Sequence, residues 1–117
     1  STPMQFGLAD FLADNREWCA DLPAFYEAKR DHFCRLLDGS RFSLLPTRST
    51  FFQLLDYADI SDEKDVDLAR RWTHDIGVAS IPLSVFCETP FTGTRLRFCF
   101  AKDDATLEEA ARRLRAV

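Results

Sequence analysis

The sequence predicts an α+β fold, a two-layer domain in which helices pack on one face of a small, mainly antiparallel sheet. Three observations lead to this prediction. The expected elements follow the order α, α, β, α, β, β, α, with helices roughly twice as long as strands. The 117 residues fit a single domain, 1–117. Hydrophobic residues make up 46% of the chain and include eleven Phe, enough to bury a core.

The N-terminal third of the chain is expected to form two helices. The first covers about residues 3–13, with Pro3 in its first turn. Its apolar stripe consists of Met4, Leu8, Phe11 and Leu12. The second helix is longer, with Asp21 as its cap, Pro23 in its first turn and Gly39 in left-handed conformation at its end. Its apolar stripe consists of Phe25, Phe33, Leu36 and Leu37.

The middle of the chain predicts a strand, a helix and a second strand. The stretch "RSTFFQLLDY" is short and rich in aromatic and aliphatic residues, as strands are. A helix over residues 61–77 is expected to begin with Ser61 as its cap and to stop at Gly77. Its apolar stripe consists of Val66, Ala69 and Trp72. The stretch "VASI" is typical of a short strand, which Pro82 ends.

The last third of the chain holds its clearest elements. The stretch "CETPFTGT" contains Pro and Gly and predicts a loop. It leads into the strand "RLRFCFA" and then into the helix "DDATLEEAARRLRAV". Acidic residues near the start of this helix and arginines near its end suit the helix dipole. The residues expected to face inward are Leu107, Ala110, Ala111 and Leu114.

The strand "RLRFCFA" separates apolar and charged residues with a period of two. Three apolar side chains point to one face: Leu96, Phe98 and Phe100. The opposite face carries Arg95 and Arg97. Arg95 lies at the end of the strand and is expected at the surface. The central Arg97 indicates either a solvated sheet face or a site for a carboxylate or phosphate, which a guanidinium matches with paired donors.

Composition and motifs argue against several classes of function. The net charge of −4 disfavours non-specific nucleic-acid binding. No apolar run approaches the ~20 residues of a membrane span, so no membrane partner is expected. The dinucleotide, P-loop, nucleophile-elbow and H-E-x-x-H motifs are absent.

Cysteine and lysine positions limit the chemistry further. The four cysteines have no zinc-ligand spacing, so no metal site is expected, and they fit free thiols of a cytoplasmic protein: Cys19, Cys34, Cys87 and Cys99. None of Lys29, Lys64 and Lys102 has the sequence setting of a buried Schiff-base lysine.

Three stretches of the chain occur in an order found in a known family. "LPTRSTFFQLLDYADISD", "GVASIPLSVFCETPF" and "LRFCFAKDDATLEEAARRLRAV" together resemble the C-terminal part of class I/II aminotransferases, the pyridoxal-phosphate (PLP) enzymes of fold type I. The likeness is greatest to methionine and kynurenine aminotransferases and their glutamine-transaminase relatives. The opening "TPMQFGLADFL" is similar to the segment after the lysine region of that family, so the resemblance covers essentially the whole chain.

The resemblance implies that this chain is the small C-terminal domain of a longer, cytoplasmic, homodimeric aminotransferase. That enzyme would transfer an amino group from a methionine-like, aromatic or glutamine-like amino acid to a 2-oxo acid, with PLP as cofactor. In the family, the arginine of the R-F-C-F strand binds the substrate α-carboxylate, and Arg97 occupies that position. The Schiff-base lysine and the other cofactor-binding residues belong to the large domain. The chain alone is therefore expected to contain no catalytic or cofactor-binding residue, to be inactive and not to bind PLP.

Two departures from the family pattern affect specificity. Ser49 stands where the family has a glycine before its aromatic strand, and Phe51 stands where it has a tyrosine. These changes put the backbone geometry near the substrate side chain in question. Phe51, Phe52 and the turn "IPLSVF" are expected to shape the side-chain pocket.

An alternative of another class remains open at this point. The chain could be a stand-alone, non-catalytic α+β domain that holds an anion or another small molecule. A coding sequence that begins near Ser1 would favour this alternative, whereas an upstream S-x-x-K lysine would exclude it.

Overall fold

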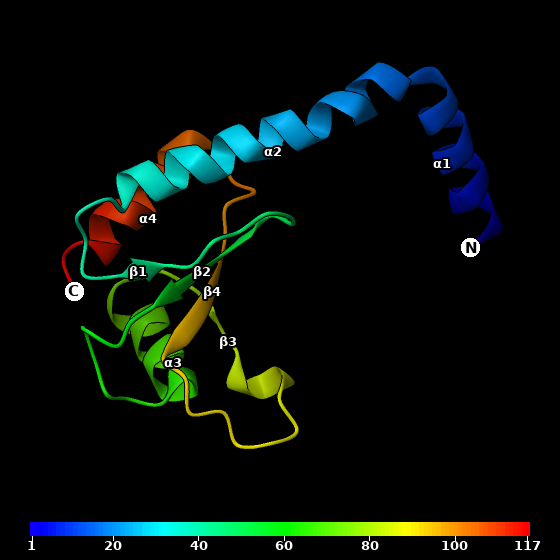
Figure 1. Cartoon of the computed structure of the whole chain (residues 1–117). Helices are drawn as coiled ribbons and strands as arrows, with labels where there is room; N and C mark the ends of the chain where they lie inside the picture. Colours follow the sequence, from blue (N-terminus) through cyan, green and yellow to red (C-terminus); the bar gives the residue numbers. More distant parts are fainter.

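The computed structural model describes residues 1–117 and has the α+β architecture that the sequence predicts (Figure 1). The elements in chain order are α1 (Thr2–Asp14), α2 (Arg16–Leu36), β1 (Ser43–Leu44), β2 (Phe52–Asp56), α3 (Asp65–Asp75), β3 (Ile81–Pro82), the 3₁₀ turn η1 (Ser84–Phe86), β4 (Arg95–Cys99) and α4 (Asp104–Leu114). Helix α2 packs against α4, and α3 contacts β3, β4 and η1.

The strands form one antiparallel sheet in the order β1-β2-β4-β3. Strands β2 and β4 form its centre and pair over their full length, from Phe52 opposite Cys99 to Asp56 opposite Arg95. The two edge strands, β1 and β3, are only two residues long. Short edges of this kind offer few free backbone groups to another chain.

One face of the sheet carries the hydrophobic core. On this face Leu55 pairs with Leu96 and Gln53 pairs with Phe98, and all four side chains are at most 3% exposed. Helices α2, α3 and α4 cover them with buried residues that include Phe33, Leu37, Leu68, Trp72, Leu107, Ala111 and Leu114. The prediction of helices on one face of the sheet is therefore confirmed, as is the inward face expected for the last helix.

Gln53 is a polar residue inside this core, which the strand pattern does not reveal. Its Nε2 donates to the carbonyl oxygens of Leu45, at 2.6 Å, and Leu54, at 2.9 Å. The thiol of Cys34 lies 3.6 Å from its Oε1. Because its amide group is hydrogen-bonded, Gln53 is buried without the free-energy cost of an unpaired polar group.

The predicted start of the second helix is wrong. Helix α2 begins at Arg16, and Pro23 lies inside it rather than in its first turn. Asn15 separates the two helices, because its Nδ2 donates to the carbonyl of Phe11 at 2.8 Å and so ends α1. Pro23 lacks the amide proton that would reach the carbonyl of Cys19. The helix nevertheless continues through this exposed residue to Leu36.

Other boundaries also differ from the prediction. Lys64, not Ser61, is the N-cap of α3, and the Ser61 hydroxyl instead accepts a bond from the Glu63 amide at 3.1 Å in the preceding turn. Of the expected strand "VASI", only Ile81 pairs with β4, and Pro82 extends the pairing rather than ending it. Strand β1 and turn η1 were not predicted, because two or three residues carry no measurable periodicity.

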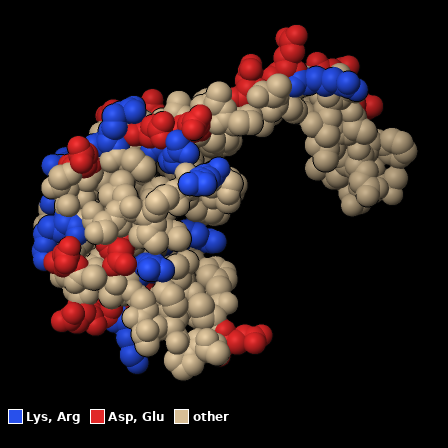
Figure 2. Space-filling view, in the orientation of Figure 1, with Lys and Arg blue, Asp and Glu red and all other residues tan.

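Helix α1 projects from the body of the molecule, and none of its residues is buried (Figure 1). Its predicted stripe, Met4, Leu8, Phe11 and Leu12, is 43–73% exposed. In Figure 2 the free end of this arm is uncharged, and charged residues lie where the arm meets α2. The radius of gyration, 17.0 Å, accordingly exceeds the about 13 Å of a compact domain of this length. No helix is long and apolar enough to cross a membrane.

The two left-handed glycines give a matched pair of stability tests. Gly39→Ala meets no atom within 4 Å and should lower the free energy of unfolding only through backbone strain, by about 1 kcal/mol. Gly77→Ala puts a Cβ 2.5 Å from Nη1 of Arg113, which donates to the Ile76 carbonyl at 2.9 Å. We expect an additional loss of about 1 kcal/mol from this displaced bond. Urea denaturation measures both losses, and equal values would contradict a role for Arg113.

Candidate functional site

The candidate site lies on the open face of the sheet, opposite the core. Arg97 of β4 pairs there with Leu54 of β2 on one side and with Ile81 of β3 on the other. Because side chains alternate along a strand, the register that buries Leu96 and Phe98 turns Arg97 to this face. The structure thus has Arg97 on the face that the sequence pattern predicts.

Two aromatic rings contact the guanidinium of Arg97. Its Cζ lies 4.1 Å from the ring centroid of Phe52 in β2 and 5.0 Å from that of Phe86 in η1. Cation–π attraction at these distances favours one position of the guanidinium. Phe51 extends the aromatic surface, with its centroid 4.5 Å from that of Phe52. Phe51 and Phe86 are 44% and 62% exposed, so this surface is open to a ligand or to another part of a larger protein.

The Nε atom of Arg97 is buried and has no hydrogen-bond partner. The guanidinium also forms no ion pair with any carboxylate of the chain, although the chain has 19 acidic residues. A buried donor without an acceptor costs about 1–3 kcal/mol, so such groups are rare in folded proteins. The arrangement can bind a planar anion, since the guanidinium fork can donate two parallel bonds to a carboxylate.

Arg95, the other arginine of the strand, has a different environment. Its Nε lies 3.5 Å from Oδ2 of Asp56, the residue opposite it in β2, and its side chain is 45% exposed. Burial opposes ionisation of Asp56, but bonds from the Thr94 hydroxyl and the Ala58 amide, together with Arg95, hold the pKa of Asp56 below its usual value. The surface position expected for Arg95 is confirmed, and of the two arginines of β4 Arg97 alone has a buried donor without a partner.

The residues just before β2 adopt an unusual backbone. Thr50 has φ of 70°, the only positive φ at a non-glycine residue in the chain. Its Oγ1 accepts a bond from the amide of Phe52 at 3.2 Å, which ties the turn to the strand that contacts Arg97. Positive φ is strained for a β-branched residue, and such strain concentrates at functional sites. The sequence predicted altered backbone geometry at Ser49 and Phe51, but the positive φ occurs at Thr50, between them.

None of the three lysines lies at the candidate site. Nζ of Lys29 pairs with Asp104 Oδ1 at 2.9 Å at the α2–α4 contact, Lys64 is the exposed N-cap of α3, and Lys102 is exposed after β4. The four cysteines are free, and burial raises the pKa of the Cys34 thiol. No group of three His, Cys, Asp or Glu residues is arranged to hold a metal ion.

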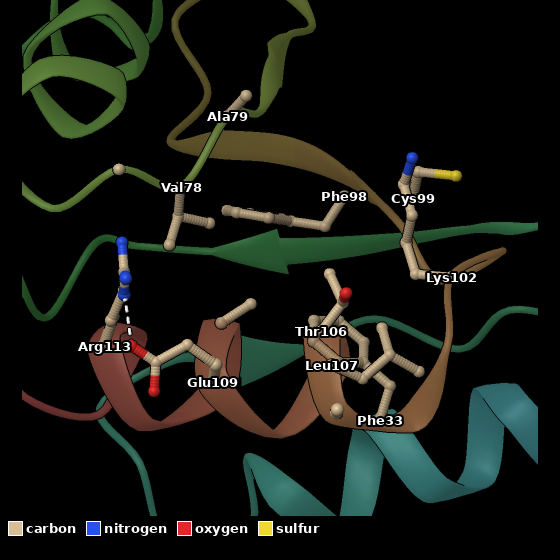
Figure 3. Close-up of a pocket in the computed structure, with 13 residues that line it drawn as sticks. Phe33, Val78, Ala79, Phe98, Cys99, Lys102, Thr106, Leu107, Glu109 and Arg113 are labelled. Atoms are coloured by element: carbon tan, nitrogen blue, oxygen red, sulfur yellow. Dashed lines mark hydrogen bonds and ion pairs between the residues drawn. The ribbon is translucent and has the colours of Figure 1, made fainter.

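Arg97 lines neither of the two cavities, which have volumes of about 550 and 560 Å³. Figure 3 shows the first, where Val78 and Phe98 line an apolar cavity beside α4. Its polar rim has the Glu109–Arg113 pair near one end, with 2.7 Å between Oε1 and Nε, and Lys102 near the other. The second cavity lies between α2 and the turn before β2. Neither contains the unpaired donor that distinguishes Arg97, so volume alone does not identify the site.

Comparison with known proteins identifies the class to which this fold and site belong. The family described as Aminotransferase class I and II matches residues 1–114. Methionine aminotransferase of Escherichia coli K12 is 46% identical over 115 residues, which are 98% of this chain and 30% of the relative. Mouse kynurenine–oxoglutarate transaminase 3 is 30% identical over an alignment that covers 99% of this chain and 30% of that relative.

The solved structures agree with these relatives. An E. coli protein whose crystal structure and reactivity identify a methionine aminotransferase function matches with a TM-score of 0.92 and 46% identity, over 99% of this chain and 30% of that one. This chain belongs to the class I and II aminotransferase family. It spans about 30% of the length of the curated relatives described here. The family resemblance inferred from the sequence motifs is therefore confirmed.

Substitutions of Thr50 test the strained turn. Asn tolerates positive φ and keeps an oxygen that can accept from the amide two residues on, so Thr50→Asn should raise the free energy of unfolding by about 0.5–1 kcal/mol. Thr50→Val keeps the branched shape but removes the oxygen, so it should lower this free energy by about 0.5–1.5 kcal/mol. Urea denaturation measures both changes. A Thr50→Asn variant less stable than the parent chain would contradict the strain.

Proposed function

We propose that this chain is the small C-terminal domain of a PLP-dependent aminotransferase, in which Arg97 binds the α-carboxylate of the amino-acid substrate. Family membership supports the class of reaction, and the buried, unpaired Nε of Arg97 is the observation that carries the residue-level proposal. The full-length protein would transfer an amino group from an amino acid to a 2-oxo acid. Methionine and aromatic amino acids are the proposed donors, because relatives are named methionine and kynurenine aminotransferases.

The surroundings of Arg97 favour a carboxylate over a solvated surface role. Phe52 and Phe86 approach the guanidinium carbon from two different elements, so water has restricted access to it. Leu54 and Ile81 beside it on the sheet are also apolar. In such a setting a charge-assisted pair with a substrate carboxylate is stronger than the same pair at an exposed site.

Binding at Arg97 would also orient the substrate. A bidentate bond fixes both carboxylate oxygens and therefore restricts rotation of the substituents on the α-carbon. The cofactor, when bound to the full-length enzyme, supplies an electron sink for the bond that breaks at that carbon. The part of Arg97 is to bind and orient, and the nearby Phe51 is suited to contact the substrate side chain.

The lysines of this chain do not fit the role of holding the cofactor covalently. Lys64 and Lys102 are exposed and Lys29 is engaged by Asp104, whereas such a lysine needs a desolvated setting near the substrate. We therefore assign the cofactor site to the large domain of the same enzyme.

The exposed surface of helix α1 is an argument for a larger assembly. Its exposed apolar stripe is more than an isolated domain of this size usually presents to water, and such a surface is suited to contact with another domain. The proposed partners are the large domain and, in a homodimer, the second subunit.

Replacement of Arg97 in the full-length enzyme tests the carboxylate proposal. Arg97→Ala strands the substrate charge, a loss of about 3–5 kcal/mol, so kcat/KM for methionine should fall by on the order of 10²–10³ or more. Arg97→Lys should recover only part of the activity, because an ammonium group lacks the planar fork. The assay compares methionine with 3-(methylthio)propylamine, which has the same side chain but no carboxylate.

The amine and Arg95 provide the controls for this experiment. Turnover of the amine should be nearly insensitive to Arg97 replacement, and Arg95→Ala should have a much smaller effect on methionine. If Arg97→Ala slows both substrates equally, or neither, Arg97 is not the carboxylate anchor.

Labelling with PLP tests the assignment of the cofactor site. Chain 1–117 is incubated with PLP, reduced with borohydride, digested and analysed by mass spectrometry. We expect only weak, unselective modification, because the three lysines lie in ordinary surface or ion-paired settings. Stoichiometric labelling of one lysine would show that the chain itself holds the cofactor.

A further inference from the structure

Asp65, the first residue of α3, is the only buried carboxylate in the chain. It is 5% exposed and forms no ion pair with any cation. Charged side chains are seldom buried without a partner, because removing the charge from water is unfavourable. The position of Asp65 therefore needs another explanation.

Hydrogen bonds from η1 stabilise this carboxylate. Oδ2 of Asp65 accepts from the backbone amide of Ser84 at 2.8 Å, and Oδ1 accepts from the Ser84 hydroxyl at 2.7 Å. Oδ1 also accepts from the amide of Val66 at 2.9 Å. The N-terminus of a helix favours negative charge as well. One side chain thus joins the start of α3 to a turn that follows β3.

Turn η1 has few other contacts that could hold it. It is three residues long and contains no buried residue, and its Phe86 is 62% exposed. Within the turn, the Phe86 amide donates to the Leu83 carbonyl at 3.1 Å. Such local bonds define the shape of a turn but not its place on the protein. The bonds from Ser84 to Asp65 are the ones that attach η1 to α3.

The attachment reaches the candidate site through Phe86. This residue follows Ser84 by two positions in the same turn, and its ring centroid lies 5.0 Å from Cζ of Arg97. The second ring on Arg97, that of Phe52, is held by the central strand β2 and needs no such anchor. Only the Phe86 side of the guanidinium depends on a loop.

We propose that Asp65 is a positioning residue for substrate recognition: through Ser84 it holds η1 so that Phe86 confines the guanidinium of Arg97. This inference rests on the proposed role of Arg97 as the carboxylate anchor. Without the bonds from Ser84 to Asp65, Arg97 would keep its charge but would be free to move, so the substrate carboxylate would bind to a less organised site. A carboxylate suits this role because both of its oxygens accept, and Ser84 offers two donors.

The experiment uses the full-length enzyme with Asp65→Asn. Asn has the same shape, but its amide nitrogen would face a backbone N–H in either orientation, that of Ser84 at the Oδ2 position or that of Val66 at the Oδ1 position. We expect KM for methionine to rise about tenfold, with a smaller change in kcat, because the weakened contact acts on carboxylate binding. Turnover of 3-(methylthio)propylamine should be unchanged. Binding of 4-(methylthio)butyrate, which has the carboxylate but no amino group, should weaken about tenfold in calorimetry.

Asp103 supplies the matched control. Its Oδ1 accepts from the amide of Thr106 at 2.8 Å and its Oδ2 from the Thr106 hydroxyl at 3.0 Å, the same pair of donors at the start of another helix. Asp103→Asn should lower stability without changing the ratio of methionine to amine turnover. Ser84→Ala removes only the hydroxyl bond and should weaken carboxylate binding about threefold, so it replaces Asp65→Asn if that variant does not fold.

The outcomes separate this inference from the proposed function. If Arg97→Lys changes methionine turnover but Asp65→Asn and Ser84→Ala leave carboxylate binding intact, or slow methionine and the amine equally, Asp65 is not a positioning residue. If Arg97→Lys itself leaves the ratio of the two substrates unchanged, the proposed role of Arg97 fails instead.

Discussion

The pairing of β2 with β4 is the constraint on which the core and the candidate site both depend. One register places Leu55 opposite Leu96 on the helix-covered face and Leu54 opposite Arg97 on the open face. A slip by one residue would turn Leu96 and Phe98 to the open face and force Arg97 into the core. The free energy that buries the apolar side chains therefore also fixes where the guanidinium lies, and the site needs no separate mechanism to orient its strand.

Stability and recognition oppose each other at this face. The unpaired Nε of Arg97 and the positive φ of Thr50 each lower the stability of the fold by about 1–3 kcal/mol. Both lie next to the aromatic surface formed by Phe51 and Phe52. Asp56, on the same face of the sheet, is by contrast well paired through bonds from Thr94 and Ala58. The proximity of the strained turn to the unpaired Nε of Arg97 is consistent with a site that a ligand completes.

The chain has a hydrophobic core that does not involve helix α1. Its body buries fifteen apolar residues in one cluster, which supports the sheet and three helices. Helix α1 contributes none of them, and an edge-to-face contact between the rings of Phe11 and Trp18, with centroids 5.6 Å apart, connects it to α2. Local helix propensity and this contact define the arm, and its apolar stripe stays exposed. The chain spans about 30% of the length of its family relatives.

The periodicity of apolar residues was sufficient to predict the longer helices and strands. The sequence by itself determined that β4 alternates between core and Arg97, that α4 buries Leu107 and Leu114, and that Gly77 follows the end of α3, since each depends on residues close together in the chain. The motif resemblance likewise needed only the order of short stretches. The same local signals misplaced the start of α2, because Pro favours the first turn of a helix, whereas Pro23 lies inside one.

Only the tertiary structure decided what surrounds the site. The contacts of Arg97 with Phe52 and Phe86, and those of Asp65 with Ser84, join residues on different elements. These contacts arise because the sheet order inserts β4 between β2 and β3, which no period in the sequence encodes. Whether Arg97 lacks an acceptor depends on where every side chain around it lies, and those side chains come from several elements. For that reason the sequence could single out Arg97 over Arg95, but only the packed structure showed that its Nε is buried without an acceptor.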